Sequence, residues 1–259
     1  MLLKDKIRFV LRRNPQLIEK IRKIIGKKSD LEIYFKFLNQ NSVFIDIGAN
    51  KGQITLPISH FLNGNGEIHC FEPVHESYEE LKKNITNEKP FTKIQLNNFA
   101  LGDAQSEIEI NIPGVDHTQA SIKRHRDHSW NNEKKIKVQK TKMKTLDTYI
   151  KENEIKRVDF IKCDVEGAEM LVISGAKKLL SSCDPPILKL EIYEGWTKSF
   201  GYHPRDLIRL LEECGNYSAY HISPNGLNRV RSTDELIPGI FWEWLDFLFL
   251  PPKMMYKID

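Results

Sequence analysis

The sequence predicts an α/β protein whose seven-stranded, mostly parallel sheet carries helices on both faces. Three observations lead to this fold class. Short β-branched and aromatic runs alternate with amphipathic segments, glycines follow the first run, and acidic residues end several of the runs. Strands that alternate with helices pair in parallel through right-handed crossovers. Because ligands of such sheets bind outside the carboxyl ends of the strands, functional residues are expected there.

The first strand and its turn occupy residues 43–52, VFIDIGANKG, and a helix is expected over residues 53–62. Gly48 can adopt a backbone angle that other residues avoid, and Gly52 lets the helix begin close to a ligand, with free N–H groups facing it. This arrangement is typical of a site for an adenosine-type cofactor, although a tight turn in any α/β domain shows the same pattern. The candidate cofactor-binding residues are Asp46, Gly48, Ala49, Asn50 and Gly52.

The spacing of the two glycines distinguishes between kinds of cofactor. The dinucleotide fingerprint G-x-G-x-x-G requires a middle glycine that this turn lacks. The Gly-Lys-Ser/Thr of a P-loop is missing as well. The pattern D-x-G-x-x-x-G instead resembles the first motif of class I S-adenosylmethionine-dependent methyltransferases.

The second strand, residues 67–72, ends in an acid that is expected to bind a ribose. Glu72 lies 24 residues after Gly48 and is followed by Pro73, which stops the strand. Rossmann-like sheets place an acid about there to accept hydrogen bonds from both ribose hydroxyls. Glu72 and Pro73 are therefore candidate cofactor contacts, and the alternative for Glu72 is a solvated acid at a strand end.

The third strand, which begins near residue 94, is expected to end at the adenine. Residues 98–100 would flank the base, with Asn98 as the polar group that reaches it and Ala100 beside it. An asparagine at the end of a strand equally often stabilises a turn, so both interpretations of Asn98 stay open.

Charge is unevenly distributed along the 259 residues, whose formal net charge is +4. Residues 1–28 hold ten Lys and Arg against two Asp and Glu, so the rest of the chain carries −4. A mildly acidic body argues against a nucleic-acid partner. Four cysteines without a C-x-x-C pair indicate reduced thiols and a cytoplasmic protein, rather than a zinc site or a disulfide framework.

The chain is expected to comprise a basic amphipathic helical extension (residues 1–40), one domain (residues 41–252) and a tail (residues 253–259). The extension either packs against the domain as a solvated helix or contacts anionic lipid as a peripheral membrane anchor. It lacks the apolar core of a signal peptide, and no stretch of the sequence is apolar and long enough to span a bilayer. The oligomeric state is not indicated.

Residues 104–145 interrupt the alternation of strands and helices. Residues 107–112 and 135–140 alternate apolar and polar side chains and are expected to pair as antiparallel strands around a polar, His-rich loop. A loop of this length inside a compact domain is usually functional or disordered, and its position favours a substrate lid. The irregular spacing of its histidines favours surface positions over a metal site. Its candidate substrate contacts are Asp116, His117 and Ser121.

Six segments, in their order and spacing, resemble the FkbM family of methyltransferases: VFIDIGANKGQIT, CFEP, NNFALGD, TLD, DFIKCDVEGAEMLVISGA and PILKLEIY. The resemblance extends over residues 41–252, apart from the His-rich loop. It implies a Rossmann-like class I methyltransferase fold with a reversed last strand. It also implies S-adenosylmethionine as the donor, S-adenosylhomocysteine as the product, and a hydroxyl on a sugar, glycan or secondary metabolite as the acceptor.

Carboxylates in the last two of these segments are candidates for the chemistry. Alternation places Asp164 at the end of the fourth strand, opposite Asp46 at the end of the first. Two carboxylates there suit a cationic methyl donor. The alternative is that Asp164 caps the turn. Methylation of a hydroxyl also requires a base to remove its proton. Glu166 and Glu191 are the first candidates, followed by Asp164, with His117 in reserve. A divalent metal held by these acids is left open.

Two other functions compete with methyl transfer. A nicotinamide-dependent reductase is disfavoured by the missing middle glycine and by the lack of a recognisable Tyr-x-x-x-Lys relay. A non-catalytic module could retain the fold in order to present its basic helix, and it would then bind no adenosine cofactor. The expected partner is therefore a small-molecule or glycan acceptor.

Overall fold

The computed structural model describes residues 29–114, 117–124, 136–223, 225–230 and 245–257. Residues 1–28 of the predicted basic extension (residues 1–40) lie outside this part of the chain, as do Asp116 and most of the His-rich loop.

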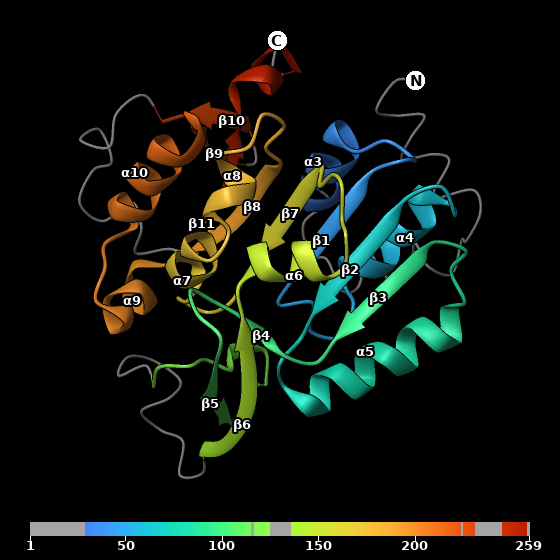
Figure 1. The fold of residues 1–259 in the computed structure, drawn as a ribbon, viewed down its shortest axis with the longest axis vertical. Helices are drawn as coiled ribbons and strands as arrows, with labels where there is room; N and C mark the ends of the chain where they lie inside the picture. Colours follow the sequence, from blue (N-terminus) through green and yellow to red (C-terminus); the bar gives the residue numbers. More distant parts are fainter. Residues whose placement is uncertain (1–28, 115–116, 125–135, 224, 231–244, 258–259) are drawn as a thin grey trace.

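The central sheet is formed by β1 (Val43–Ile47), β2 (Glu67–Phe71), β3 (Lys93–Asn97), β7 (Phe160–Cys163), β8 (Ile187–Ile192), β9 (Ser218–Ser223), β10 (Gly226–Arg229) and β11 (Leu245–Leu250). The strand order is β10-β9-β11-β8-β7-β1-β2-β3 (Figure 1). From β8 to β3 the strands are parallel, whereas β11 is antiparallel to both of its neighbours. The predicted parallel sheet with a reversed last strand is therefore confirmed. The sequence does not predict β10, a short polar strand that pairs with β9 and extends the sheet to eight strands.

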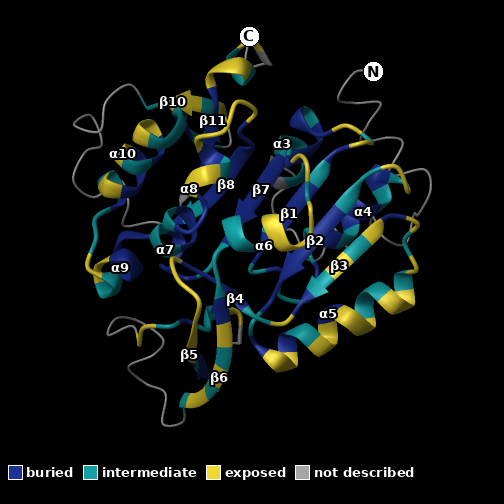
Figure 2. Ribbon diagram, in the orientation of Figure 1, coloured by how far each residue is buried: buried dark blue, intermediate teal, exposed yellow. Residues whose placement is uncertain are grey.

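Helices cover both faces of this sheet, as predicted (Figure 1). Alternate residues of each strand supply two cores: Phe44 and Phe160 belong to one, Ile45 and Ile161 to the other. Figure 2 shows the central strands buried between the two helical layers. One layer contains α3 (Ser29–Phe37), α4 (Thr55–Leu62) and α5 (His75–Glu88), and the other contains α6 (Leu146–Glu152), α7 (Glu169–Ser174), α8 (Lys177–Leu180) and α10 (Pro204–Gly215). Shorter turns are α9 (Glu194–Thr197), η3 (Lys198–Phe200) and η5 (Pro252–Lys257).

The helical pattern of residues 168–180, AEMLVISGAKKLL, is divided in the structure into α7 and α8. Gly175 lies at the division, and a Cβ at this position would collide with the carbonyl oxygen of Gly102. The N–H group of Asp147 also donates a hydrogen bond to the Gly175 carbonyl, at 3.0 Å. Close tertiary packing therefore ends the helix, and the helical periodicity of the sequence does not reveal it.

A second, three-stranded sheet is formed by β4 (Ala100–Leu101), β5 (Ser106–Pro113) and β6 (Ile136–Lys144). Glu109 lies opposite Lys140 in the antiparallel β5–β6 pair, so the strand pair predicted for the insertion is confirmed. β4 joins β6 in parallel. This sheet lies beyond the carboxyl ends of β1, β2 and β7, where it can form a wall of a ligand site (Figure 1).

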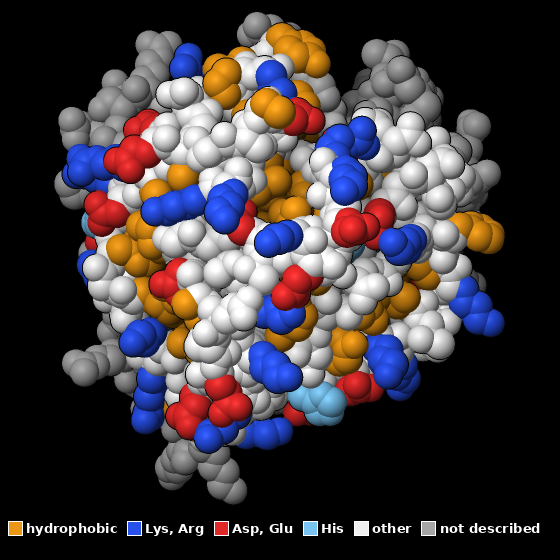
Figure 3. Space-filling model, in the orientation of Figure 1, with side chains coloured by type: hydrophobic (Ala, Val, Ile, Leu, Met, Phe, Trp, Pro, Cys, Tyr) orange, Lys and Arg blue, Asp and Glu red, His pale blue; other side chains and the backbone are white. Residues whose placement is uncertain are grey.

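Lys and Arg side chains are interspersed with Asp and Glu on the face viewed in Figure 3. Across the described ranges, no helix has the length and hydropathy that a membrane span requires.

Candidate active site

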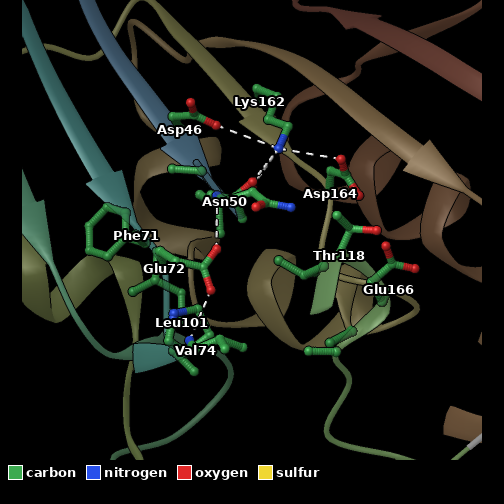
Figure 4. A pocket seen from close by; sticks show the side chains of 18 of the residues that line it. Asp46, Asn50, Phe71, Glu72, Val74, Leu101, Thr118, Lys162, Asp164 and Glu166 are labelled. Atoms are coloured by element: carbon green, nitrogen blue, oxygen red, sulfur yellow. Dashed lines mark hydrogen bonds and ion pairs between the residues drawn. The ribbon is translucent and has the colours of Figure 1, made fainter. Parts of the chain in front are cut away.

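A cavity of about 690 Å³ lies at the carboxyl ends of the parallel strands, where the sequence places the ligand (Figure 4). Its size is that of a typical small-molecule site. Its walls are the turn after β1, the end of β2, residues 99–101 after β3, the β7–α7 turn with β8 and β11, and the insertion. The predicted residues that line it are Asp46, Gly48, Ala49, Asn50, Glu72, Pro73, Ala100, Asp164, Glu166 and Glu191.

The turn after β1 contacts both β2 and the end of β7. The N–H groups of Gly48 and Ala49 each donate to the carbonyl oxygen of Phe71 at 3.0 Å. Gly48 has a φ of +73°, and a Cβ at this position would collide with the carbonyl oxygen of Asp164. Glycine at this position thus allows two strand ends that are distant in the sequence to form one wall.

Gly52 does not line the cavity. α4 begins at Thr55, later than expected, and a Cβ at residue 52 would lie 2.8 Å from a methyl carbon of Leu81 on α5. With a φ of +90°, Gly52 serves the close packing of the turn against α5.

Glu72 lies at the cavity edge and is only 6% exposed. Its two carboxylate oxygens accept hydrogen bonds from the N–H groups of Asn50, at 2.8 Å, and Val74, at 2.9 Å. Burial raises the pKa of this carboxyl to about 7, against the opposing effect of those two bonds. A carboxylate offers about four lone-pair positions, so Glu72 retains the capacity to accept further hydrogen bonds.

Asn98 lies outside the cavity lining. Its side-chain amide donates to the carbonyl oxygens of Glu72, at 2.8 Å, and Pro73, at 3.2 Å, and so fixes the segment after β2. Phe99 and Ala100, the residues that follow it, line the cavity. The aromatic side chain of Phe99 packs against Phe71 with the two ring centroids 5.5 Å apart. Phe99 belongs to the segment of residues 98–100 that was expected to flank the base, whereas Phe71 is not among the predicted contacts, because its apolar character resembles that of any strand end.

Lys162 is a central member of the site that the sequence does not single out. Its ammonium donates to the carbonyl oxygen of Gly48, at 2.6 Å, and lies 3.5 Å from the Asp46 carboxylate and 3.4 Å from that of Asp164 (Figure 4). Burial alone would lower the pKa of Lys162, but the carboxylates of Asp164 and Asp46 raise it above its ordinary value. The feature of the sequence that could have identified Lys162 is its position as the one charged residue of the otherwise apolar strand FIKC.

Four carboxyls line the cavity at the ends of β7, β8 and β11: Asp164, Glu166, Glu191 and Asp246. Burial and the Asp164 carboxylate raise the pKa of Glu191 to about 10. Burial opposes the ionisation of Asp164, but Lys162 and a hydrogen bond with Glu191 lower its pKa. Burial also raises the pKa of Glu166, as do the nearby charges of Asp164 and Glu191. This arrangement favours charge on Asp164 and protons on the two glutamates.

Asp246, on β11, is not among the predicted site residues. It lies directly opposite Glu191 in the antiparallel pairing of β11 with β8, and its carboxylate pairs with Lys189. Nothing in the periodicity of DFLFL indicates which residue of β8 it faces, because that register is fixed by the tertiary fold.

The insertion supplies the remaining wall through Ile110 of β5 and through Thr118, Ala120 and Ile122, which follow that strand. The hydroxyl of Ser121, itself 2% exposed, donates to the carbonyl oxygen of Glu166 at 2.9 Å and so joins the insertion to the β7–α7 turn.

The other two candidate substrate contacts are Asp116 and His117. Asp116 lies outside the described residues, and His117 belongs to the short helix η1 (His117–Gln119), but its side chain is not described. Within the described ranges, no group of three or more His, Cys, Asp or Glu is arranged to hold a metal ion.

A doubly wound sheet with a reversed strand, a glycine turn after β1 and an acid after β2 define the class I fold of S-adenosylmethionine-dependent methyltransferases. The family model of the methyltransferase FkbM domain matches residues 46–217, and the chain belongs to this family. The protein is therefore an S-adenosylmethionine-dependent methyltransferase.

Among the proteins that resemble the chain are a curated relative and two solved structures. The hexuronic acid methyltransferase AglP of Haloferax volcanii is 23% identical over 199 residues, 76% of this chain and 72% of the relative. A putative rRNA methylase from Clostridium thermocellum shares the fold, with a TM-score of 0.52 at 12% identity, over 87% of this chain and 96% of that one. A SAM-dependent O-methyltransferase from Thermotoga maritima has a TM-score of 0.45 at 13% identity, over 88% and 69% of the two chains.

The residues at the ends of β1 and β2 fit the chemistry of this cofactor. The side-chain oxygen of Asn50 is buried, lines the cavity and has no hydrogen-bond partner among the described residues. Such an atom costs about 1–3 kcal/mol unless a ligand or water satisfies it. Glu72 can accept hydrogen bonds from hydroxyls, and the rings of Phe71 and Phe99 provide an apolar surface for a flat base.

Proposed function

We propose that the protein is an O-methyltransferase that methylates a hydroxyl of a sugar, glycan or secondary-metabolite acceptor. One observation supports this proposal. The same cavity is lined by Gly48 and Glu72, which suit the methyl donor, and by the carboxyls of Asp164, Glu166 and Glu191. The hexuronic acid methyltransferase among the relatives supports a sugar as the kind of acceptor.

The donor is assigned to the end of the cavity formed by β1 and β2. Glu72 accepts hydrogen bonds from the ribose hydroxyls of S-adenosylmethionine, and the side-chain oxygen of Asn50 accepts one from an N–H or O–H group of the same molecule. Ala100 and Pro73 contact the adenine base. S-adenosylmethionine supplies a methyl group that its sulfonium has already activated. Asp46 and Asp164 place negative charge near this cation, while Lys162 limits the repulsion between the two acids.

The acceptor is assigned to the end of the cavity that holds the carboxyls. The protein must orient the hydroxyl oxygen and take up its proton as the new carbon–oxygen bond forms, and a well-placed base contributes roughly 10²- to 10⁴-fold to the rate. Glu166 and Glu191 are the proposed bases, and each acts only after it has released the proton that its raised pKa favours. For Glu191, ionised Asp164, with which it shares a hydrogen bond, can accept that proton.

The remaining assignments concern the insertion and the cellular setting. The insertion of residues 104–145 acts as the lid over the acceptor, since Ile110, Thr118 and Ile122 line the cavity. Cys70, Cys163, Cys183 and Cys214 are free thiols, which supports a cytoplasmic location. The basic extension of residues 1–28 remains a candidate for contact with anionic lipid.

The test is calorimetric titration of the purified protein with S-adenosylmethionine and S-adenosylhomocysteine, repeated on Glu72→Ala. We expect the substitution to weaken binding of both by about 1.5–3 kcal/mol, the range for hydrogen bonds to a charged group. Glu79→Ala, which removes an exposed acid of α5, is the matched control and should bind like the wild type. Unchanged affinity in folded Glu72→Ala would remove Glu72 from the donor site.

A further inference from the structure

The acceptor end of the cavity carries an excess of acidic groups. Among the described residues that line the cavity, six are acidic and Lys162 alone is basic. Four of the six lie on the β7–α7 turn, β8 and β11, at the end assigned to the acceptor. The acids are Asp46, Glu72, Asp164, Glu166, Glu191 and Asp246.

We propose that this enzyme methylates neutral or amine-bearing hexosides and discriminates against acceptors that carry a carboxylate, with Asp246 as a specificity-determining residue. The inference rests on the proposed O-methyltransferase function and narrows its acceptor. It also separates this chain from its relative AglP, whose name assigns it a hexuronic acid.

Among the described residues, Lys162 in the cavity lining and Lys189 beside it are already engaged. Lys162 is bonded to the carbonyl oxygens of Gly48 and Ile47 and paired with two carboxylates, so it has little capacity to bind an acceptor anion. Lys189 is 8% exposed, pairs with Asp246 and lies 6.0 Å from the ring centroid of Tyr34, outside the cavity lining.

The raised pKa values of Glu166 and Glu191 agree with this shortage of positive charge in the described part of the cavity lining. Burial and neighbouring carboxylates raise the pKa values of Glu166 and Glu191, so this end of the cavity already holds more carboxyls than it can ionise together. A further carboxylate, brought by a uronic acid, would meet the same burial and repulsion. An ammonium group would relieve that repulsion.

The shape and chemistry of the walls suit a sugar ring. Carboxylates accept hydrogen bonds from hydroxyls, and Ile110, Ala120 and Ile122 of the insertion add an apolar part to the same lining. A hexoside presents hydroxyl donors around its ring edge and C–H groups on its faces. Such a ring can therefore contact the carboxyls with its edge and the apolar wall with a face.

The test compares methyl glycosides that differ only in charge. Initial rates of labelled methyl transfer from S-adenosylmethionine would be measured with the glucose, glucosamine and glucuronic acid members, and with their galacto and manno counterparts. We expect kcat/KM for the neutral or amino members to exceed that of the matched uronate by tenfold or more, since about 1.4 kcal/mol of repulsion gives a factor of ten. Equal or faster transfer to a uronate would overturn the proposal.

Two further outcomes are distinguishable. Donor binding without transfer to any glycoside of the panel would overturn the hexoside assignment and leave the methyltransferase function intact. A folded protein that does not bind S-adenosylmethionine would instead remove the proposed function itself.

Asp246→Asn tests the specificity-determining residue. It removes one negative charge and leaves the Lys189 ammonium without its partner, so the preference for neutral over uronate acceptors should fall by about tenfold. Asp184→Asn is the matched control, because Asp184 pairs with Lys253 outside the cavity lining. An unchanged preference in folded Asp246→Asn would exclude Asp246 as the determinant.

Discussion

The ammonium of Lys162 lies 2.6 Å from the carbonyl oxygen of Gly48, and this hydrogen bond ties β7 to the turn after β1. The same ammonium lies between the carboxylates of Asp46 and Asp164. One buried cation therefore stabilises the backbone of the donor turn and two acids of the cavity at once.

Lys162→Met should destabilise the fold and weaken donor binding. Asp46 is fully buried, and loss of its cation leaves it with the hydroxyl of Thr55, at 2.6 Å, as its remaining polar side-chain partner among the described residues. Removing one member of a buried ion pair costs about 3–5 kcal/mol. Urea unfolding would measure the loss. Lys93→Met is the control: it removes a lysine whose side chain is 71% exposed and paired with Glu67, so it should cost below about 1 kcal/mol.

Gly48→Ala should be far more damaging than Gly201→Ala, although both glycines have positive φ, +73° and +80°. The added Cβ would collide with the Asp164 backbone at residue 48 but meets nothing within 4 Å at residue 201. Gly201→Ala thus reports only the backbone strain of about 1–3 kcal/mol. Unfolding free energies and S-adenosylmethionine affinities of the two variants would separate the cost of backbone strain from the cost of the collision. Equal losses of stability in both variants would contradict the assigned collision at residue 48.

The fold was largely predictable because its signals are local. Val43–Ile47 and Glu67–Phe71 have the apolar runs of buried strands, and the turns after them carry glycine or proline. β10 was not predictable, since GLNR has no periodicity and pairs only because β9 offers a free edge. The break at Gly175 depends on the backbone of Gly102, a contact that the local pattern does not encode.

The cavity lining was predictable where a residue follows directly from a strand end, as for Glu72 and Asp164. Lys162 and Asp246 could not be assigned in this way. Their roles depend on which side chains face them across the sheet: Asp46 lies beside Lys162 in the β1–β7 register, and Glu191 faces Asp246 across β8 and β11. The packing of the assembled core fixes these strand registers, so the sequence of one strand does not show which residue of its neighbour each side chain faces.

Stability should fall as the pH rises from 5 to 8, in part through Glu169. This side chain is 1% exposed, and burial raises its pKa from an ordinary 4.5 to about 7. The folded state therefore binds the proton more tightly than the unfolded chain. The resulting stabilisation is present below pH 4.5 and is lost as the pH rises through 7, by up to about 3 kcal/mol.

Glu169→Gln should flatten this pH dependence. One Glu169 oxygen accepts from the N–H groups of Val165 and Gly167, and the other lies 3.3 Å from the Tyr202 hydroxyl, so an amide can replace the protonated acid. Urea unfolding at pH 5 and pH 8 should show wild type losing more stability than the variant. Glu79→Gln, an exposed acid on α5, should follow the wild type; a variant slope equal to that of the wild type would contradict the assignment.

Glu166→Gln and Glu191→Gln should separate turnover from donor binding. The amide keeps the size of each side chain but cannot take up the acceptor proton, so the variant that lacks the base should slow turnover by roughly 10²- to 10⁴-fold. Because the ribose contact is assigned to Glu72, calorimetric affinity for S-adenosylmethionine should change by less than about 1 kcal/mol. Single-turnover rates with the accepted hexoside would measure the chemical step. If both variants retain full activity, neither glutamate is the base, and Asp164, which Lys162 holds in its ionised form, becomes the residue to replace by Asn.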